Sequence, residues 1–175
     1  MRSVVQRVRR AAVAVEGEPT RGIGAGLLVL VAVAPGDGEA EARWMAEKCA
    51  HLRIFPDEAG KMNRSLLDCA GEALVVSQFT LYGDARKGRR PSFVGAASAE
   101  IADALYLRVA ALLRELGVPR VETGTLAAHM VVSLENDGRV TLILHTPRAT
   151  AARAMARSWH WPWLRFAPSD VSIVS

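Results

Sequence analysis

The sequence Ala73-Leu74-Val75-Val76-Ser77-Gln78-Phe79-Thr80-Leu81 begins as an apolar run and then changes abruptly to polar residues. Residues 73–76 have the composition of a buried β-strand. The hydroxyl and amide groups that follow cost free energy when buried unless they are hydrogen-bonded. Such a conflict between pattern and composition is typical of a functional site. The simpler alternative is a strand end whose polar side chains bond the backbone of a turn.

The strand and helix patterns around this stretch predict an α+β fold with a mostly antiparallel or mixed sheet and two main helices. Residues 27–33 are apolar on both faces, which predicts a central strand. Further strand patterns occur at residues 4–15 (interrupted near Arg9-Arg10), 52–55, 61–63, 130–134 and 140–144. The signal Asn136-Asp137-Gly138 predicts a hairpin turn between the last two strands, which would let the flanking His129 and His145 approach each other.

Two amphipathic helices are predicted from residue spacing and end signals. The first spans about residues 38–51, with Asp37 as its cap. The second follows Ser98, and Gly117 and Pro119 end it. Their apolar positions are expected to pack in the core.

Length and composition bound the class of protein. A chain of 175 residues that is half apolar fits one globular domain. No apolar run approaches the roughly 20 residues that span a bilayer, and the N-terminus has no signal-peptide pattern. Cys49 and Cys69 lack zinc-ligand spacing, so we expect a reduced, cytoplasmic protein without a membrane partner.

The basic charge is unevenly distributed. The net charge is +4, of which the C-terminal extension at residues 148–175 contributes +3. That extension holds three of the four tryptophans, and it follows a predicted domain at residues 1–147. It fits base stacking with phosphate contact, membrane-surface contact, or an addition that packs on its own domain or a partner. Basic groups in the body cluster at residues 7–10 and 86–90, which suits local phosphate contact.

Common catalytic signatures are absent from the sequence. It contains no G-x-S-x-G elbow, no H-E-x-x-H motif and no phosphate-binding Walker loop. The four histidines have no metal-ligand spacing. We therefore expect no metal and no cofactor. An enzyme of this composition would work by positioning its substrate and by backbone N–H groups that stabilise an oxyanion.

Several motifs taken together resemble the D-aminoacyl-tRNA deacylase family. The resemblance covers residues 1–146 and leaves out the C-terminal extension. The segments that carry it are Val4-Val5-Gln6-Arg7-Val8, Leu52-Arg53-Ile54-Phe55, Gly60-Lys61-Met62-Asn63, Ser77-Gln78-Phe79-Thr80-Leu81, Arg86-Lys87-Gly88-Arg89-Arg90-Pro91-Ser92-Phe93 and Ser133-Leu134-Glu135-Asn136-Asp137-Gly138-Arg139-Val140-Thr141.

The resemblance implies a homodimer of small barrel-like subunits that needs no metal. Such enzymes hydrolyse the ester between a D-amino acid, or glycine, and the 3′ adenosine of tRNA. Ser77, Gln78, Phe79 and Thr80 would line the site. Two mechanisms stay open: Thr80 as nucleophile, or assistance to a water by the terminal ribose 2′-OH. The second is favoured because no histidine or carboxylate neighbours Thr80 in sequence.

One position departs from the family pattern. The family has glycine followed by a cis proline, inserted from the partner subunit as a gate against L side chains. Here Gly138 precedes Arg139, and a cis bond before a non-proline residue costs about 2.5–4 kcal/mol. We predict a trans bond and hypothesise weakened rejection of L-amino acids or altered substrate choice. Met130 lies in a second segment near the pocket that also departs from the family pattern.

The candidates for contact with tRNA are Arg7, Arg86, Lys87, Arg89 and Arg90.

Three functions remain open at this stage. The leading one is an aminoacyl-tRNA proofreading hydrolase. The second is a non-catalytic nucleic-acid-binding dimer that keeps the fold with an altered gate. A general esterase using Thr80 is the third, and the missing base disfavours it.

Overall fold

The computed structural model describes residues 1–147 and 171–173. Its elements are β1 (Arg2–Val15), β2 (Arg21–Ile23), β3 (Gly26–Ala32), α1 (Glu39–His51), β4 (Phe55–Pro56), β5 (Met62–Arg64), β6 (Glu72–Ser77), the 3₁₀ turn η1 (Phe79–Tyr82), α2 (Ala99–Glu115), β7 (Val121–Thr123), β8 (Met130–His145) and β9 (Val171–Ile173). The C-terminal extension at residues 148–175, with its three tryptophans, lies outside these residues, apart from β9.

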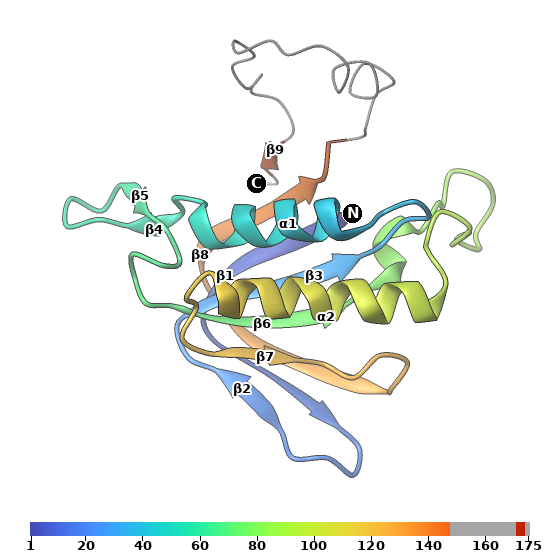
Figure 1. Ribbon diagram of the computed structural model, residues 1–175, viewed down its shortest axis with the longest axis horizontal. Helices are drawn as coiled ribbons and strands as arrows, with labels where there is room; N and C mark the ends of the chain where they lie inside the picture. The colour runs from blue at the N-terminus through green and yellow to red at the C-terminus, as the bar shows by residue number, and fades with distance from the viewer. Residues whose placement is uncertain (148–170, 174–175) are drawn as a thin grey trace.

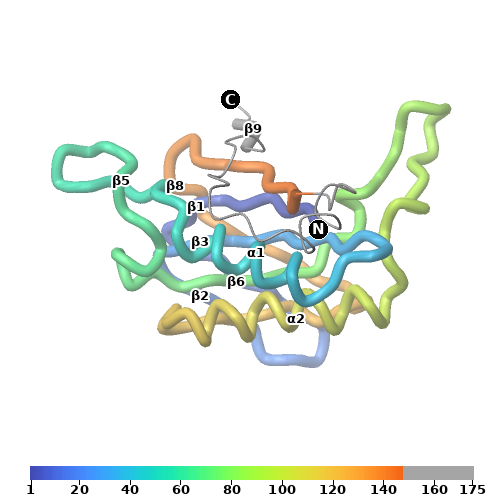
Figure 2. The backbone as a smooth tube through the Cα atoms, turned by 45° about the horizontal axis from the view of Figure 1, so that its top comes forward, coloured from blue at the N-terminus to red at the C-terminus, as the bar shows by residue number. Residues whose placement is uncertain are grey.

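A seven-stranded mixed sheet organises the fold. Its order is β7-β6-β3-β1-β8-β9, with β2 paired to β1. Strands β3, β6 and β7 run parallel, whereas β1 pairs antiparallel with β2, β3 and β8. Helices α1 and α2 cover one face (Figures 1 and 2), and the sheet curls until β2 contacts β6 and β7. The predicted α+β, barrel-like mixed sheet is confirmed.

Two apolar clusters fill the two faces of this sheet. The larger lies under the helices and includes Met45, Leu113 and the fully buried Leu27. The smaller lies inside the curl and includes Leu28, Leu74 and Val76, with Met130 packed against it. Strand β3 contributes to both clusters, because its successive side chains point to opposite faces. This explains why residues 27–33 are apolar throughout, as expected of a central strand.

The last two predicted strands form one long strand, so the predicted hairpin is wrong. Strand β8 pairs along β1 over Met130–Asn136 and again over Thr141–His145. Residues 137–140 leave this register as a bulge opposite Arg7. His129 and His145 therefore lie at opposite ends of a 16-residue strand, not close together. The turn signal is real, but the long β1 offers a partner to both halves, so the chain bulges instead of reversing.

Smaller predictions differ at element ends. The strand predicted at residues 52–55 begins only at Phe55 and pairs with β5. The N-cap of α1 is Gly38, not Asp37. Asp37 instead accepts from the Ala34 N–H at 2.6 Å and from the Met1 ammonium at 2.8 Å. Its carboxylate therefore fixes the turn before the helix and the start of β1.

Gly26 marks a close approach between β3 and β6. A Cβ at this position would lie 1.8 Å from the Glu72 carbonyl oxygen, which is backbone and cannot move aside. Gly26→Ala is expected to lower the free energy of unfolding by about 3 kcal/mol. Gly24→Ala is the matched control, since its nearest neighbour would be Glu72 Oε2 at 3.8 Å. Denaturant unfolding that gives equal stabilities for the two variants would contradict the packing described here.

Candidate active site

The parallel strands β3, β6 and β7 bring their carboxyl ends to one edge of the sheet. Ser77 pairs with Val31 of β3, and the Gln78 N–H continues the ladder to the Val31 carbonyl at 2.7 Å. On the other side the Gly124 N–H bonds the Val75 carbonyl at 3.1 Å. Segments 77–80 and 124–126 therefore leave the sheet side by side. Ligands of parallel sheets bind at this edge.

The polar stretch leaves β6 by a sharp turn. Gln78 is non-helical (φ −141°, ψ 75°), and η1 follows directly. Phe79 is 51% exposed, and its ring meets Phe93 edge to face at 5.2 Å. Gln78 Nε2 donates to Thr80 Oγ1. Among the described residues, the N–H groups of Phe79 and Thr80 have no acceptor. The Gln78 and Thr80 side chains bond each other and not the backbone of a turn, which the simpler alternative had expected, while two main-chain donors stay open.

A second wall of the site comes from the segment after β7. Thr125 N–H donates to Met130 Sδ at 3.3 Å. A Cβ at Gly124 would lie 2.7 Å from that sulfur and 3.5 Å from Val76 Cγ1. Met130, singled out from sequence, is therefore beside the last buried residue of β6. A groove of about 460 Å³ flanks the segment, lined by residues 123–126 and by α2 residues that include Tyr106.

Arg2 supports the far end of the turn and was not singled out from sequence. Its Nη1 donates to the Leu81 carbonyl at 2.6 Å, and its guanidinium lies 4.8 Å from the Tyr82 ring centroid. Arg21 and Tyr106 hold the second wall and were missed as well. Each acts on backbone far away in sequence, so no local motif signals any of them.

The basic candidates fall into two groups. Lys87, Arg89 and Arg90 lie exposed on the loop after η1. Arg86 shares this loop, and its hydrogen bonds to Asp84 lower the pKa of that carboxyl to about 2. Arg7 differs, because its side chain is only 12% exposed and pairs with Asp137 at 3.0 Å. Arg7 also donates to the carbonyls of Asp137 and Ile54, so its guanidinium braces the β8 bulge.

The residues of the gate loop, 136–139, adopt a defined conformation on that bulge. No peptide bond in the described part of the chain is cis, so the predicted trans Gly138–Arg139 bond is confirmed. Gly138 has φ +70°, a conformation that favours glycine. Asn136 Nδ2 donates to the Gly138 carbonyl. The Arg139 side chain is exposed.

Within one copy, the gate loop and the polar stretch lie apart. Ser77 aligns across the sheet with Val31, Ser3 and Leu144, whereas the gate loop faces Arg7. The gate loop and Ser77 are separated by four residues along the strand direction, about 13 Å, and by three strand spacings across the sheet, about 14 Å. Gly138 and Arg139 therefore do not lie beside residues 77–80 of their own chain.

Residues 77–80 and Met130 offer hydroxyls, an amide and a thioether, and the Glu18 carboxylate near the second wall is paired with Arg21. Within residues 1–147 and 171–173, no group of three His, Cys, Asp or Glu side chains is placed to hold a metal ion. Thr80 Oγ1 is bonded to an amide, which is not a base. The two open N–H groups are the donors best placed for a developing negative charge.

Known proteins match this chain over almost the whole described fold. The family model for D-Tyr-tRNA(Tyr) deacylase matches residues 4–145. A D-aminoacyl-tRNA deacylase of Thermomicrobium roseum is 60% identical over 144 residues, covering 82% of this chain and 93% of the relative. The Myxococcus xanthus protein of the same name is 57% identical over 153 residues, covering 87% and 99%.

Two solved structures share the fold. A c-Myc DNA unwinding element binding protein aligns with a TM-score of 0.78 at 40% identity, covering 84% of this chain and 99% of that one. A probable eukaryotic D-amino acid tRNA deacylase aligns with a TM-score of 0.66 at 21% identity, covering 78% and 94%, which shows the fold alone.

The fold and the matches together define a hydrolase. More particularly, the chain belongs to the D-aminoacyl-tRNA deacylase family, which the family model and relatives of up to 60% identity establish. The activity is hydrolysis of D-aminoacyl-tRNA. In the part of the chain that the structure describes, no helix is long and apolar enough to cross a membrane.

Proposed function

We propose that residues 77–80 and 124–130 together form a pocket that holds the aminoacylated 3′ adenosine, and that the terminal ribose 2′-OH assists the hydrolysis. The observation that carries this proposal is that the Thr80 hydroxyl has no catalytic base beside it among the described residues. Its hydrogen-bond partner is the Gln78 amide, and within residues 1–147 and 171–173 no carboxylate or imidazole bonds it, so no base activates it as a nucleophile there. A group on the substrate must then orient the attacking water.

The reaction proceeds by attack of water on the ester carbonyl carbon. The 2′-OH accepts a hydrogen bond from that water and holds it near the carbonyl. The carbonyl oxygen gains negative charge and accepts hydrogen bonds from the N–H groups of Phe79 and Thr80. The water oxygen bonds the carbonyl carbon, the bond from that carbon to the ribose 3′ oxygen breaks, and the proton that the water loses passes through the 2′-OH to the 3′ oxygen, so that a free amino acid and tRNA leave.

A second copy of the chain completes the pocket in this proposal. The gate loop lies well away from residues 77–80 of its own chain, yet its conformation is fixed by Arg7 and Asn136. A braced loop that does nothing for its own pocket is suited to enter a neighbour's. A two-fold dimer places the same loop in both pockets.

The Arg139 position tests this arrangement through stereoselectivity. Loss of the family proline is expected to weaken the exclusion of L side chains. Arg139→Pro should raise the ratio of kcat/KM for D- over L-aminoacyl-tRNA by about ten- to a hundredfold, the effect of a few redirected contacts. Arg139→Ala serves as the control, because it removes the same side chain and adds no proline. Equal and strict D-selectivity in all three proteins would refute the altered gate.

Contacts to tRNA beyond the 3′ end are assigned to Lys87, Arg89 and Arg90, with Arg86 held by Asp84. Their exposed loop adjoins η1, and basic side chains at such a site bind phosphates in a salt-dependent way. The buried Arg7 contributes by bracing the gate loop. A tRNA substrate also supports a cytoplasmic location.

One observation favours a second candidate function. The solved structure at 40% identity is named for binding a DNA unwinding element, so a nucleic-acid-binding dimer without turnover is the alternative. Release of free amino acid from D-aminoacyl-tRNA supports the hydrolase. Binding with a steep salt dependence and no release would support the alternative.

A further inference from the structure

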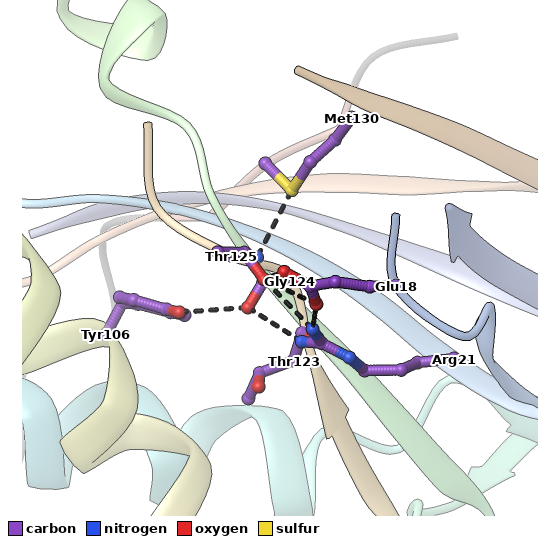
Figure 3. Close-up of polar contacts among 7 residues, drawn as sticks. All are labelled: Glu18, Arg21, Tyr106, Thr123, Gly124, Thr125 and Met130. Atoms are coloured by element: carbon purple, nitrogen blue, oxygen red, sulfur yellow. Dashed lines mark hydrogen bonds and ion pairs between the residues drawn. The ribbon is translucent and has the colours of Figure 1, made fainter. Parts of the chain in front are cut away.

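We infer that Arg21 and Tyr106 are positioning residues that hold the 123–125 segment, and through it Met130, as one wall of the substrate pocket. This role rests on the pocket assigned above. Neither residue belongs to the sequence stretches that define the site. Arg21 lies at the start of β2, and Tyr106 lies in the middle of α2. They reach the segment after β7 from two different elements (Figure 3).

Arg21 binds three successive residues of the wall. Its Nη1 donates to the Thr123 carbonyl at 2.7 Å and to the Gly124 carbonyl at 3.3 Å. Its Nη2 donates to Thr125 Oγ1 at 3.0 Å and pairs with Glu18. The Arg21 side chain is 29% exposed, so these charge-assisted bonds form in a partly desolvated place and are strong. The planar fork fixes direction as well as distance.

Tyr106 holds the same segment from the helical face. The residue is buried, and its hydroxyl donates to the Gly124 carbonyl at 3.1 Å. A tyrosine hydroxyl is protonated and can donate at neutral pH, and burial, followed by the charge of Asp103, raises the pKa of Tyr106 further. The Gly124 carbonyl therefore accepts from two donors on different elements, which leaves it little freedom to rotate.

The turn that follows needs such an external restraint. Ala127 has φ +60°, a left-handed conformation that costs a residue with a side chain about 1 kcal/mol or more. The turn is closed by the Ala128 N–H on the Thr125 carbonyl at 3.3 Å. An alanine stays there only when the residues on both sides are fixed. Arg21 and Tyr106 fix the preceding side.

The restraint reaches the pocket through Met130. The Thr125 N–H donates to Met130 Sδ, and the thioether lies against Gly124 and Val76, next to Ser77. Met130 is a flexible side chain that adapts its shape to its surroundings. If the 123–125 segment moves, the sulfur loses its donor and the wall beside residues 77–80 changes shape. Such a movement is expected to misplace the substrate in the pocket more than it lowers the stability of the protein.

The test compares the full-length variants Arg21→Met and Tyr106→Phe with Arg120→Met. Arg120 precedes β7 and its side chain pairs with Glu122 at 3.0 Å, so it controls for loss of an arginine near the same strand. Hydrogen exchange is measured over residues 123–130, and kcat and KM are measured with D-aminoacyl-tRNA. Both variants are expected to exchange faster in this segment and to lose about tenfold in kcat/KM, while Arg120→Met stays at the wild-type values.

A double variant with Met130 distinguishes a positioning role of Arg21 from a general loss of stability. Met130→Leu removes the sulfur acceptor, so Arg21→Met should cost little in kcat/KM when Met130→Leu is already present. Independent, multiplying losses would overturn the role, as would unchanged kcat/KM in both variants. Tyr106→Phe removes one hydroxyl and decides the matter if Arg21→Met fails to fold. Absence of turnover by the unmutated chain would overturn the proposed function together with this role, whereas turnover unaffected by the substitutions overturns this role alone.

Discussion

A D-aminoacyl-tRNA whose terminal adenosine lacks the 2′-OH is expected to be hydrolysed at least about 10³-fold more slowly than the natural substrate, a loss of about 4 kcal/mol of transition-state stabilisation. The reason is that, in the proposed mechanism, the 2′-OH holds the attacking water beside the ester. A well-placed group of this kind contributes a large share of the rate through orientation. Single-turnover hydrolysis of 3′-charged tRNA, with and without the 2′-OH, measures the effect.

The matched protein variant is Thr80→Ala. The Thr80 hydroxyl bonds the Gln78 amide, and in this account it positions the turn without attacking the ester. Its loss is therefore expected to reduce kcat by less than about tenfold. The opposite pattern, in which Thr80→Ala abolishes hydrolysis and the deoxy substrate reacts normally, would identify Thr80 as the nucleophile.

Phe79→Pro is expected to reduce kcat by about 10²- to 10³-fold, the usual effect of removing one oxyanion donor. Proline removes the N–H of residue 79, which is one of the two open donors at the edge of the sheet. It suits the first position of the η1 turn, where its fixed φ is compatible with the fold. The preceding Gln78 is non-helical, as a residue before proline prefers.

The control for this variant is Phe79→Ala, which removes the same ring and keeps the N–H. It breaks the contact with Phe93, so both variants share that loss. The difference in kcat between them isolates the main-chain donor. Equal activities of Phe79→Pro and Phe79→Ala, at equal stability in denaturant unfolding, would show that this N–H does not bind the oxyanion.

The sequence predicted the fold where local pattern and global packing agree. The run at residues 27–33 is apolar on both faces because β3 lies between two apolar clusters. Both helices were found from the spacing of their apolar residues, and the end of α2 from Gly117, since an amphipathic stripe and a terminal glycine are local properties. The polar end of β6 was found because it violates the pattern of a buried strand.

Other parts could not be predicted because they depend on partners distant in sequence. The signal at residues 136–138 normally closes a hairpin, and only the 14-residue length of β1 turns it into a bulge. Arg7 was expected to contact tRNA, yet its side chain is used inside the fold by Asp137 and Ile54. No local motif marks Arg21 or Tyr106, because their partners are distant in sequence. Arg21 binds a carbonyl 102 residues away, and Tyr106 binds one 18 residues away.

The central claim is that one copy's pocket and another copy's gate loop form a single site, and mixed dimers test it most directly. Phe79→Pro disables the pocket. Gly138→Val disables the gate, because Gly138 has φ +70° and a Cβ there would lie 3.3 Å from Arg7 Nη2. In a randomly mixed population, half of the dimers contain one of each chain, and each of these has one intact site. Hydrolysis of D-aminoacyl-tRNA should recover to about a quarter of the wild-type rate. A mixture no more active than the average of the two variants alone would contradict the shared site.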